Sequence, residues 1–132
     1  MKTKLFIISS VCAVTLLLTS AMPGGNGVIS KEGQFTVVNT TTLAQSVEGY
    51  NGATPLKIYI KSGKIEKIEA LQNQETPRYF AKVKKQLLSR WNGMTIKAAK
   101  SAKVDAVTGA TLSSNAVIEN VKRGLDYYQK HK

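Results

Sequence analysis

The segment LKIYIKSGKIEKIEA, residues 56–70, constrains the fold more than any other part of the chain. In its first half, apolar and polar residues alternate, which is the period-two pattern of a half-buried β-strand. Ser62 and Gly63 form a two-residue turn of the kind that β-hairpins use. In the returning half, Ile65 and Ile68 are three positions apart, so we expect a bulge or an early twist there. The chain is therefore expected to build an antiparallel sheet around this hairpin.

Helical patterns follow the hairpin. A helix is predicted over Thr76–Trp91, with the threonine hydroxyl as its cap and a proline in its first turn. A short helical turn is expected over Thr95–Ala99, and a last helix from about Ser114 to Tyr128, where apolar residues recur at helical spacing. Strands come early and helices late, which predicts the α+β class. The expected fold is a small antiparallel sheet, made of the hairpin Leu56–Ala70 and a flanking strand, packed with two main helices.

The residues before the hairpin carry weaker patterns. Residues 22–45 are interpreted as a linker followed by a first extended segment. Met22–Lys31 is glycine-rich and poor in charge, as linkers are, and Phe35–Val47 is rich in β-branched residues. Gly49–Gly52 is a turn cluster. With 132 residues in all, the chain has room for one domain, which we assign to residues 46–132.

The first 21 residues are typical of a secretory signal peptide. Lys2 and Lys4 precede an apolar run, Leu5–Leu18, and small residues follow at plausible cleavage positions. The alternative is an uncleaved anchor, which would attach the protein to the membrane through residues 5–21. Either interpretation predicts an exported protein, periplasmic or associated with the cell envelope.

The composition argues against several classes of function. Cys12, the single cysteine, lies in the apolar run, so cleavage would leave neither a disulfide nor a thiolate. His131, the single histidine, is next to the last residue, where a general base or a metal ligand is not expected. The formal net charge is +11, and +9 remains without Lys2 and Lys4. No nucleic-acid motif is present, so we interpret the charge as a solvated surface that also attracts an anionic ligand or partner.

The segment DAVTGATLSS, residues 105–114, concentrates small and hydroxylated residues just before the last predicted helix. Gly109 permits backbone geometry that other residues avoid. Four hydroxyl side chains accompany it: Thr108, Thr111, Ser113 and Ser114. With the free amides of a helix N-terminus they would make a phosphate site. Asp105 would repel a phosphate, so we expect it to be an N-cap, a turn acceptor, or a group that holds a metal while a phosphate is attached. A capped turn without a ligand is the alternative interpretation.

The same ten residues resemble the flavinylation motif of FMN-binding domains, D-x-x-[ST]-G-A-[ST]-x-[ST]. Such domains occur in the C subunit of the sodium-pumping NADH:quinone reductase, in the G subunit of the Rnf complex and in many exported flavoproteins. The resemblance extends upstream through Gly49-Tyr50, Thr54–Leu56, the hairpin and Asn73–Pro77, and so covers about residues 46–129. It implies that a magnesium-dependent flavin transferase, using FAD, esterifies the FMN phosphate to the hydroxyl of Thr111.

The resemblance also implies roles for other residues. The rest of the motif would support the attached FMN: Asp105, Thr108, Gly109, Ala110, Leu112, Ser113 and Ser114. By resemblance and position, the candidates for contacts with the isoalloxazine ring are Asn73, Gln74, Glu75 and Thr76. Tyr50 or Tyr79 is expected either to stack on the ring or to be an ordinary packing residue. No catalytic residue and no resident metal ligand is assigned.

The function implied is that of an exported electron carrier with covalent FMN, which passes electrons between redox partners at the cell envelope. Two alternatives stay open. One is a small extracytoplasmic flavin reductase, although the chain without residues 1–21 has no histidine or cysteine placed for proton transfer. The other is a module without flavin that binds an anionic ligand or the envelope.

Overall fold

The computed structural model describes residues 27–132, and the predicted signal or anchor segment lies outside them. Four strands form one antiparallel sheet in the order β1-β2-β3-β4. The strands are β1 (Ile29–Glu32), β2 (Phe35–Asn39), β3 (Leu56–Lys61) and β4 (Lys64–Ala70). The helices follow as α2 (Pro77–Gln86), the 3-10 turn η2 (Leu88–Trp91), α3 (Ile96–Ser101) and α4 (Thr111–His131). The α+β class and the antiparallel sheet are confirmed.

The predicted hairpin is β3–β4. Ser62 and Gly63 both adopt positive φ, 53° and 75°, as a two-residue hairpin turn with right-handed strand twist requires. The register shifts between Tyr59 and Ile60, because Tyr59 faces Lys67 while Ile60 faces Ile65. The expected bulge therefore exists.

Three boundaries differ from the expected ones. Ile29–Lys31, expected as linker, belong to β1, which pairs with β2 through a turn at Gly33 with φ of 61°. The extended segment expected over Phe35–Val47 ends at Asn39, after which residues 41–46 form turns. The helix expected to run to Trp91 changes to a 3-10 turn after Gln86. A short strand and a change of helix type leave little periodic signal, which explains the first and third differences. In the second, Thr41 and Thr42 lie in turns although β-branched residues favour strands.

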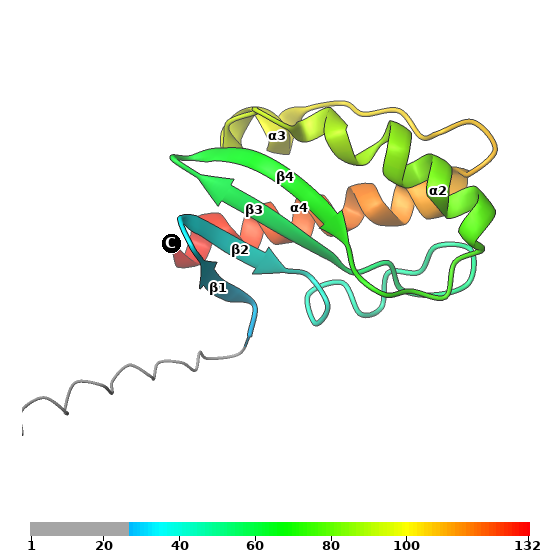
Figure 1. The fold of residues 1–132 in the computed structure, drawn as a ribbon, viewed down its shortest axis with the longest axis horizontal. Helices are drawn as coiled ribbons and strands as arrows, with labels where there is room; N and C mark the ends of the chain where they lie inside the picture. The colour runs from blue at the N-terminus through cyan, green and yellow to red at the C-terminus, as the bar shows by residue number, and fades with distance from the viewer. Residues whose placement is uncertain (1–26) are drawn as a thin grey trace, which may run out of the picture.

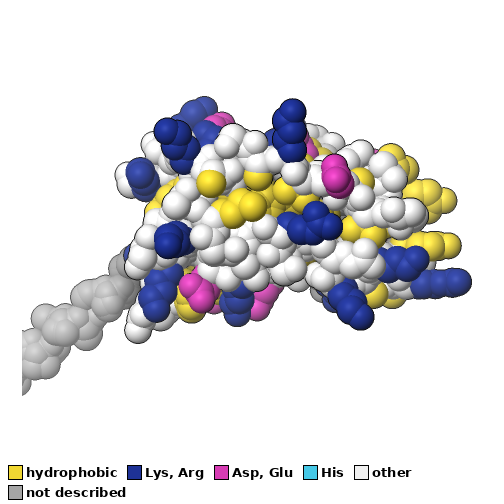
Figure 2. Space-filling model, turned by 90° about the horizontal axis from the view of Figure 1, so that it is seen from above, with side chains coloured by type: hydrophobic (Ala, Val, Ile, Leu, Met, Phe, Trp, Pro, Cys, Tyr) yellow, Lys and Arg dark blue, Asp and Glu magenta, His cyan; other side chains and the backbone are white. Residues whose placement is uncertain are grey.

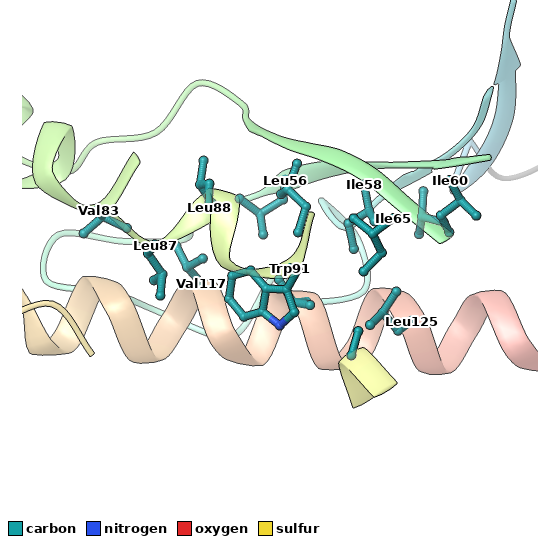
Figure 3. Close-up of a cluster of buried hydrophobic side chains, with 14 of the residues drawn as sticks. Leu56, Ile58, Ile60, Ile65, Val83, Leu87, Leu88, Trp91, Val117 and Leu125 are labelled. Atoms are coloured by element: carbon teal, nitrogen blue, oxygen red, sulfur yellow. The ribbon is translucent and has the colours of Figure 1, made fainter. Parts of the chain in front are cut away.

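The helices cover the sheet on one side (Figure 1). Helix α4 lies across the sheet behind β2 and β3, and α2, η2 and α3 lie beside β4. Gly124 lets α4 approach closely, since a Cβ there would lie 2.7 Å from Ile58 Cδ1 and 3.0 Å from Thr40 Cγ2. The core fills the space between sheet and helices (Figure 3). Trp91, 2% exposed, lies between the strands and α4.

A buried polar group links the loop before β3 to the middle of α4. The Thr40 hydroxyl donates to Asn120 Oδ1 at 2.5 Å and accepts from the backbone N–H of Leu56 at 2.9 Å. The amide nitrogen of Asn120 donates to the carbonyl of Ala116 at 2.9 Å and to the Thr54 hydroxyl at 3.4 Å. These side chains are fully buried, so their hydrogen bonds fix the loop on the helix.

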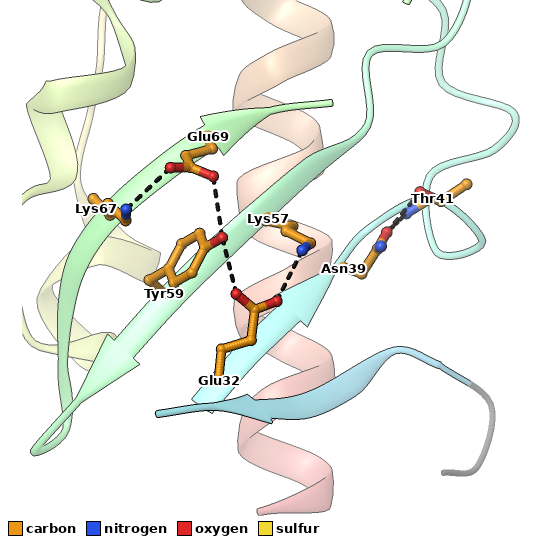
Figure 4. A network of polar contacts seen from close by, with 7 residues as sticks. All are labelled: Glu32, Asn39, Thr41, Lys57, Tyr59, Lys67 and Glu69. Carbon is orange, nitrogen blue, oxygen red and sulfur yellow. Dashed lines mark hydrogen bonds and ion pairs between the residues drawn. The ribbon is translucent and has the colours of Figure 1, made fainter. Parts of the chain in front are cut away.

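The face of the sheet turned away from α4 carries a charged network (Figure 4). The Tyr59 hydroxyl lies 3.0 Å from Glu69 and 3.4 Å from Glu32, which pair with Lys67 and Lys57 respectively. Burial, with the hydrogen bond and charge of Glu69, raises the pKa of Tyr59 to about 12. Hydrogen bonds from the lysines lower the pKa of both carboxyl groups.

Candidate functional site

Three segments that are distant in sequence meet at the end of the molecule where α2 and α4 begin (Figure 1). They are the loop around residue 50, the connection before α2 and the loop that enters α4. In the last of these, Ala110 donates from its N–H to the carbonyl of Val107 at 2.9 Å, which closes a turn. Gly109 has φ of 85°, so the turn needs glycine at this position. The predicted loop geometry is present.

Helix α4 begins three residues earlier than expected, at Thr111, with Ala110 as its N-cap. Alanine has no capping side chain, and the first turn holds no acidic residue. The first backbone bond of the helix runs from the Ser114 N–H to the Ala110 carbonyl at 2.9 Å. The amides of Thr111, Leu112 and Ser113 therefore donate to no group in residues 27–132. A helix N-terminus with free amides and no carboxylate favours an anion.

The four hydroxyls of the motif occupy different environments. Ser114 is fully buried, and its Oγ accepts from the Val107 N–H at 3.0 Å, so it ties the loop to the helix. Ser113 is also buried and donates to a carboxylate oxygen of Glu75. Thr108 and Thr111 are exposed and make no side-chain hydrogen bond within the described part of the chain. Only the latter two hydroxyls are free to react or to bind a ligand.

A cleft of about 470 Å³ opens beside these amides, within the size range of small-molecule sites. Its lining residues are Tyr50, Thr76, Tyr79, Gly109, Ala110, Thr111, Leu112 and Ser113. Thr108 does not line it, so Thr111 is the free hydroxyl at the cleft.

The rim of the cleft is apolar. Tyr50, Tyr79 and Leu112 are 70%, 45% and 57% exposed, and within residues 27–132 they are the exposed large hydrophobic side chains. Figure 2 shows hydrophobic side chains protruding at the end where α2 and α4 begin, with Lys and Arg side chains beside them. Exposed apolar groups gathered on one cleft favour a flat, partly apolar ligand.

Glu75 is buried behind the cleft, at 5% exposure. Its oxygens accept from the backbone N–H groups of Tyr50 at 2.9 Å and Asn51 at 2.5 Å, and from the Ser113 hydroxyl. A Cβ on Gly49 would overlap this carboxylate and lie 3.2 Å from Ser113 Cα. Glu75 thus joins the Tyr50 loop to the first turn of α4, and its oxygens are engaged by protein donors.

The other residues of the 73–76 segment differ in position. Asn73 forms a local turn, in which Oδ1 accepts from the Glu75 N–H and Nδ2 donates to the Leu71 carbonyl, both at 3.0 Å. Gln74 is exposed and has no hydrogen-bond partner in residues 27–132. Thr76 lines the cleft but does not cap α2 through its side chain, which corrects the expected capping role. Its Oγ1 accepts instead from Asn51 Nδ2 at 3.3 Å.

Asp105 is exposed and makes neither a hydrogen bond nor an ion pair within residues 27–132. The expectation of an N-cap or turn acceptor is therefore wrong, because Ala110 occupies the N-cap. Within the same residues, His, Asp and Glu side chains form no cluster of three that could hold a metal ion.

The geometry fits an anionic group at the start of α4 and a flat, partly apolar body against the rim, and comparisons with known proteins agree. The sequence pattern of the FMN-binding domain matches residues 49–126. The chain is similar to the G subunit of the ion-translocating oxidoreductase complex of Shewanella piezotolerans, with 27% identity over 118 residues, 80% of this chain and 55% of that protein. The same-named protein of Vibrio cholerae is 29% identical over 128 residues, 86% of this chain and 60% of its own length.

The chain thus spans little more than half the length of these relatives. The domain match itself covers more than half of the chain and includes both the cleft and the 105–114 motif. The chain therefore belongs to the FMN-binding domain family, as the motif predicted, and FMN is the cofactor that this membership indicates.

Proposed function

We propose that the protein is an electron carrier whose FMN is held by a phosphoester to Thr111 Oγ1. The observation that carries the proposal is the position of this hydroxyl: exposed, free of hydrogen bonds in the described residues, and on the cleft at the first residue of α4. The amides of the first helical turn would donate to the phosphate oxygens. The buried hydroxyls of Ser113 and Ser114 are already engaged.

In the attachment step, FAD is the co-substrate that supplies the FMN group. Thr111 Oγ1 forms a bond to the FMN phosphorus, the phosphoanhydride bond to the AMP half breaks, and AMP leaves with the electron pair. The hydroxyl proton passes to a base of the flavin transferase or to solvent. Asp105, exposed and without a partner in residues 27–132, is proposed to contact the transferase's magnesium during this step.

When bound, FMN supplies reversible electron transfer, and this chain's residues would hold and shield it. The isoalloxazine ring is proposed to lie against the apolar rim of Tyr50, Tyr79 and Leu112, with Thr76 at the cleft wall. The support for this placement is the rim itself, since exposed aromatic side chains provide stacking surfaces for a flat ring. Because Glu75 is engaged by three protein donors, we assign it to positioning the cleft wall.

We further propose that the protein is exported and exchanges electrons with partners at the cell envelope. The support is the pattern of residues 1–21 and the similarity to subunits of ion-translocating oxidoreductase complexes. Within residues 27–132, no helix combines the length and the apolar character of a membrane span.

Co-expression with a flavin transferase, followed by intact-mass measurement, tests the attachment. The expected mass increase is one FMN less one water, with flavin fluorescence that survives denaturing electrophoresis. Thr111→Val should abolish both signals and keep the fold, whereas Thr108→Val, a matched change at the other free hydroxyl, should keep them. A colourless wild-type protein, or full labelling of Thr111→Val, would overturn the proposal.

A further inference from the structure

One long stretch of the chain has an unusual charge pattern. Residues 76–104 carry eight basic residues and no acidic residue. The stretch begins at the cleft with Thr76 and includes α2, η2 and α3. In the described part of the chain, only Lys100 of these eight has an ion pair, with Asp126 of α4. The remaining positive charge is therefore not neutralised by the described residues.

Helix α2 presents part of this charge as a row. Phe80 and Val83 are its buried residues, so the opposite side of the helix faces solvent. Arg78, Lys82 and Lys85 are exposed and follow one another at spacings of four and three, which places them on that outer side. Tyr79 lies on the flank of the same helix and lines the cleft. A row of three cations thus runs along the outer surface of α2, and its first member, Arg78, lies over the Tyr79 ring with its guanidinium carbon 5.7 Å from the ring centroid.

Part of this arrangement is unfavourable for the stability of helix α2. Like charges three and four residues apart repel each other. Arg78 lies in the first turn, where the helix dipole favours acids, and that turn has none. Lys85, by contrast, lies in the last turn and suits the helix dipole. An opposite charge bound at this surface would offset the repulsion among the three cations.

We propose that this α2 surface (Arg78, Lys82 and Lys85) docks an acidic protein, the redox partner that exchanges electrons with the cleft. The redox role of the partner rests on the proposed function, whereas the binding of an acidic protein to α2 does not. Cations beside an exposed cleft would steer an acidic partner toward the cofactor. A membrane surface fits less well, because an interfacial helix needs an apolar face and that of α2 is packed in the core.

A chemical-shift titration of the 15N-labelled protein tests the surface without requiring covalent FMN. An acidic flavodoxin in its oxidised form serves as the probe, and phosphatidylglycerol vesicles serve as the membrane probe. With the flavodoxin at low salt, the largest shifts are expected in α2, and they should vanish as salt rises and the Debye length falls below about 10 Å. Because no attached flavin is needed, failure of the flavinylation experiment leaves this result interpretable.

Matched variants distinguish the effect of the α2 surface on binding from the effect of the protein's net charge. Arg78→Gln/Lys82→Gln/Lys85→Gln should weaken the association at least about tenfold. Lys31→Gln/Lys61→Gln/Lys64→Gln removes the same charge from the strands, including the hairpin tip at the far end of the sheet, and should weaken it less than about threefold (Figure 1). Lys82→Gln/Lys85→Gln is a second variant, which leaves the Arg78–Tyr79 contact in place.

Three outcomes would overturn the proposal. They are equal weakening by the two triple variants, shifts that centre outside α2, and shifts in α2 with the vesicles but none with the flavodoxin.

Discussion

Replacing Glu75 tests how the cleft is held together. Its carboxylate accepts two backbone N–H bonds from the Tyr50 loop and one hydroxyl bond from Ser113, at 5% exposure. A hydrogen bond to a charged group contributes about 1.5–3 kcal/mol. The two loop amides are only partly buried, so water can replace part of their loss after Glu75→Ala. We therefore expect Glu75→Ala to lower the free energy of unfolding by about 3 kcal/mol, and Glu75→Gln by about half as much.

Urea unfolding followed by tryptophan fluorescence provides the assay. Trp91 is the single tryptophan and is buried in the core, so its emission reports on the whole domain. A double-mutant cycle with Ser113→Ala should give a coupling free energy of at least about 0.5 kcal/mol. Gln74→Ala, a change at an exposed neighbour without a partner in residues 27–132, is the control and should unfold like the wild type. If Glu75→Ala stayed within about 0.5 kcal/mol of the wild type, the anchoring role of Glu75 would be refuted.

Three further changes test other parts of the structure. Gly124→Val should lower the free energy of unfolding by about 1–3 kcal/mol, measured by urea unfolding, because the new side chain would lie too close to Ile58 and Thr40. Stability equal to the wild type would contradict the close approach of α4. Tyr59→Phe should remove the phenolate absorbance transition at about pH 12, and an unchanged titration would contradict the burial and Glu69 contact that raise this pKa. Because the folded-state pKa exceeds the ordinary value of 10, the wild type should lose stability relative to Tyr59→Phe as the pH rises from about 10 to 12. Ser114→Ala should cost about 1–3 kcal/mol, since it leaves the buried Val107 N–H without its acceptor, and thermal unfolding at the wild-type temperature would contradict this.

The sequence carried enough local signal to predict the β3–β4 hairpin and its bulge. Alternation and the Ser62-Gly63 turn are short-range features, and the structure follows them. Strand β1 was missed because its four residues, ISKE, are mostly exposed and follow a glycine-rich segment. The start of α4 was misplaced because a hydroxyl-rich segment before a helix is typical of a capped turn, whereas Ala110 is the N-cap. The Ser113 hydroxyl instead bonds to Glu75, and the Ser114 hydroxyl bonds to the Val107 N–H.

The sequence predicted the motif of the candidate site, but it did not predict how the side chains around the cleft are arranged. The 105–114 pattern pointed to the FMN-binding domain family, which the domain match confirms. The position of Glu75 could not be predicted, because its partners are 24, 25 and 38 residues away in sequence and no local pattern encodes them. The small size of Gly49, which accommodates that carboxylate, was visible only as a turn signal.

The most direct test of the central claim is the site of flavin attachment. The protein is co-expressed with a flavin transferase and cleaved after lysine, and the peptide of residues 104–122, which contains all four hydroxyls of the motif, is fragmented in a mass spectrometer. We predict that the mass of FMN less water lies on Thr111 alone. The same mass on Thr108, Ser113 or Ser114, or a peptide without flavin, would contradict the proposal that the free hydroxyl at the start of α4 holds the cofactor.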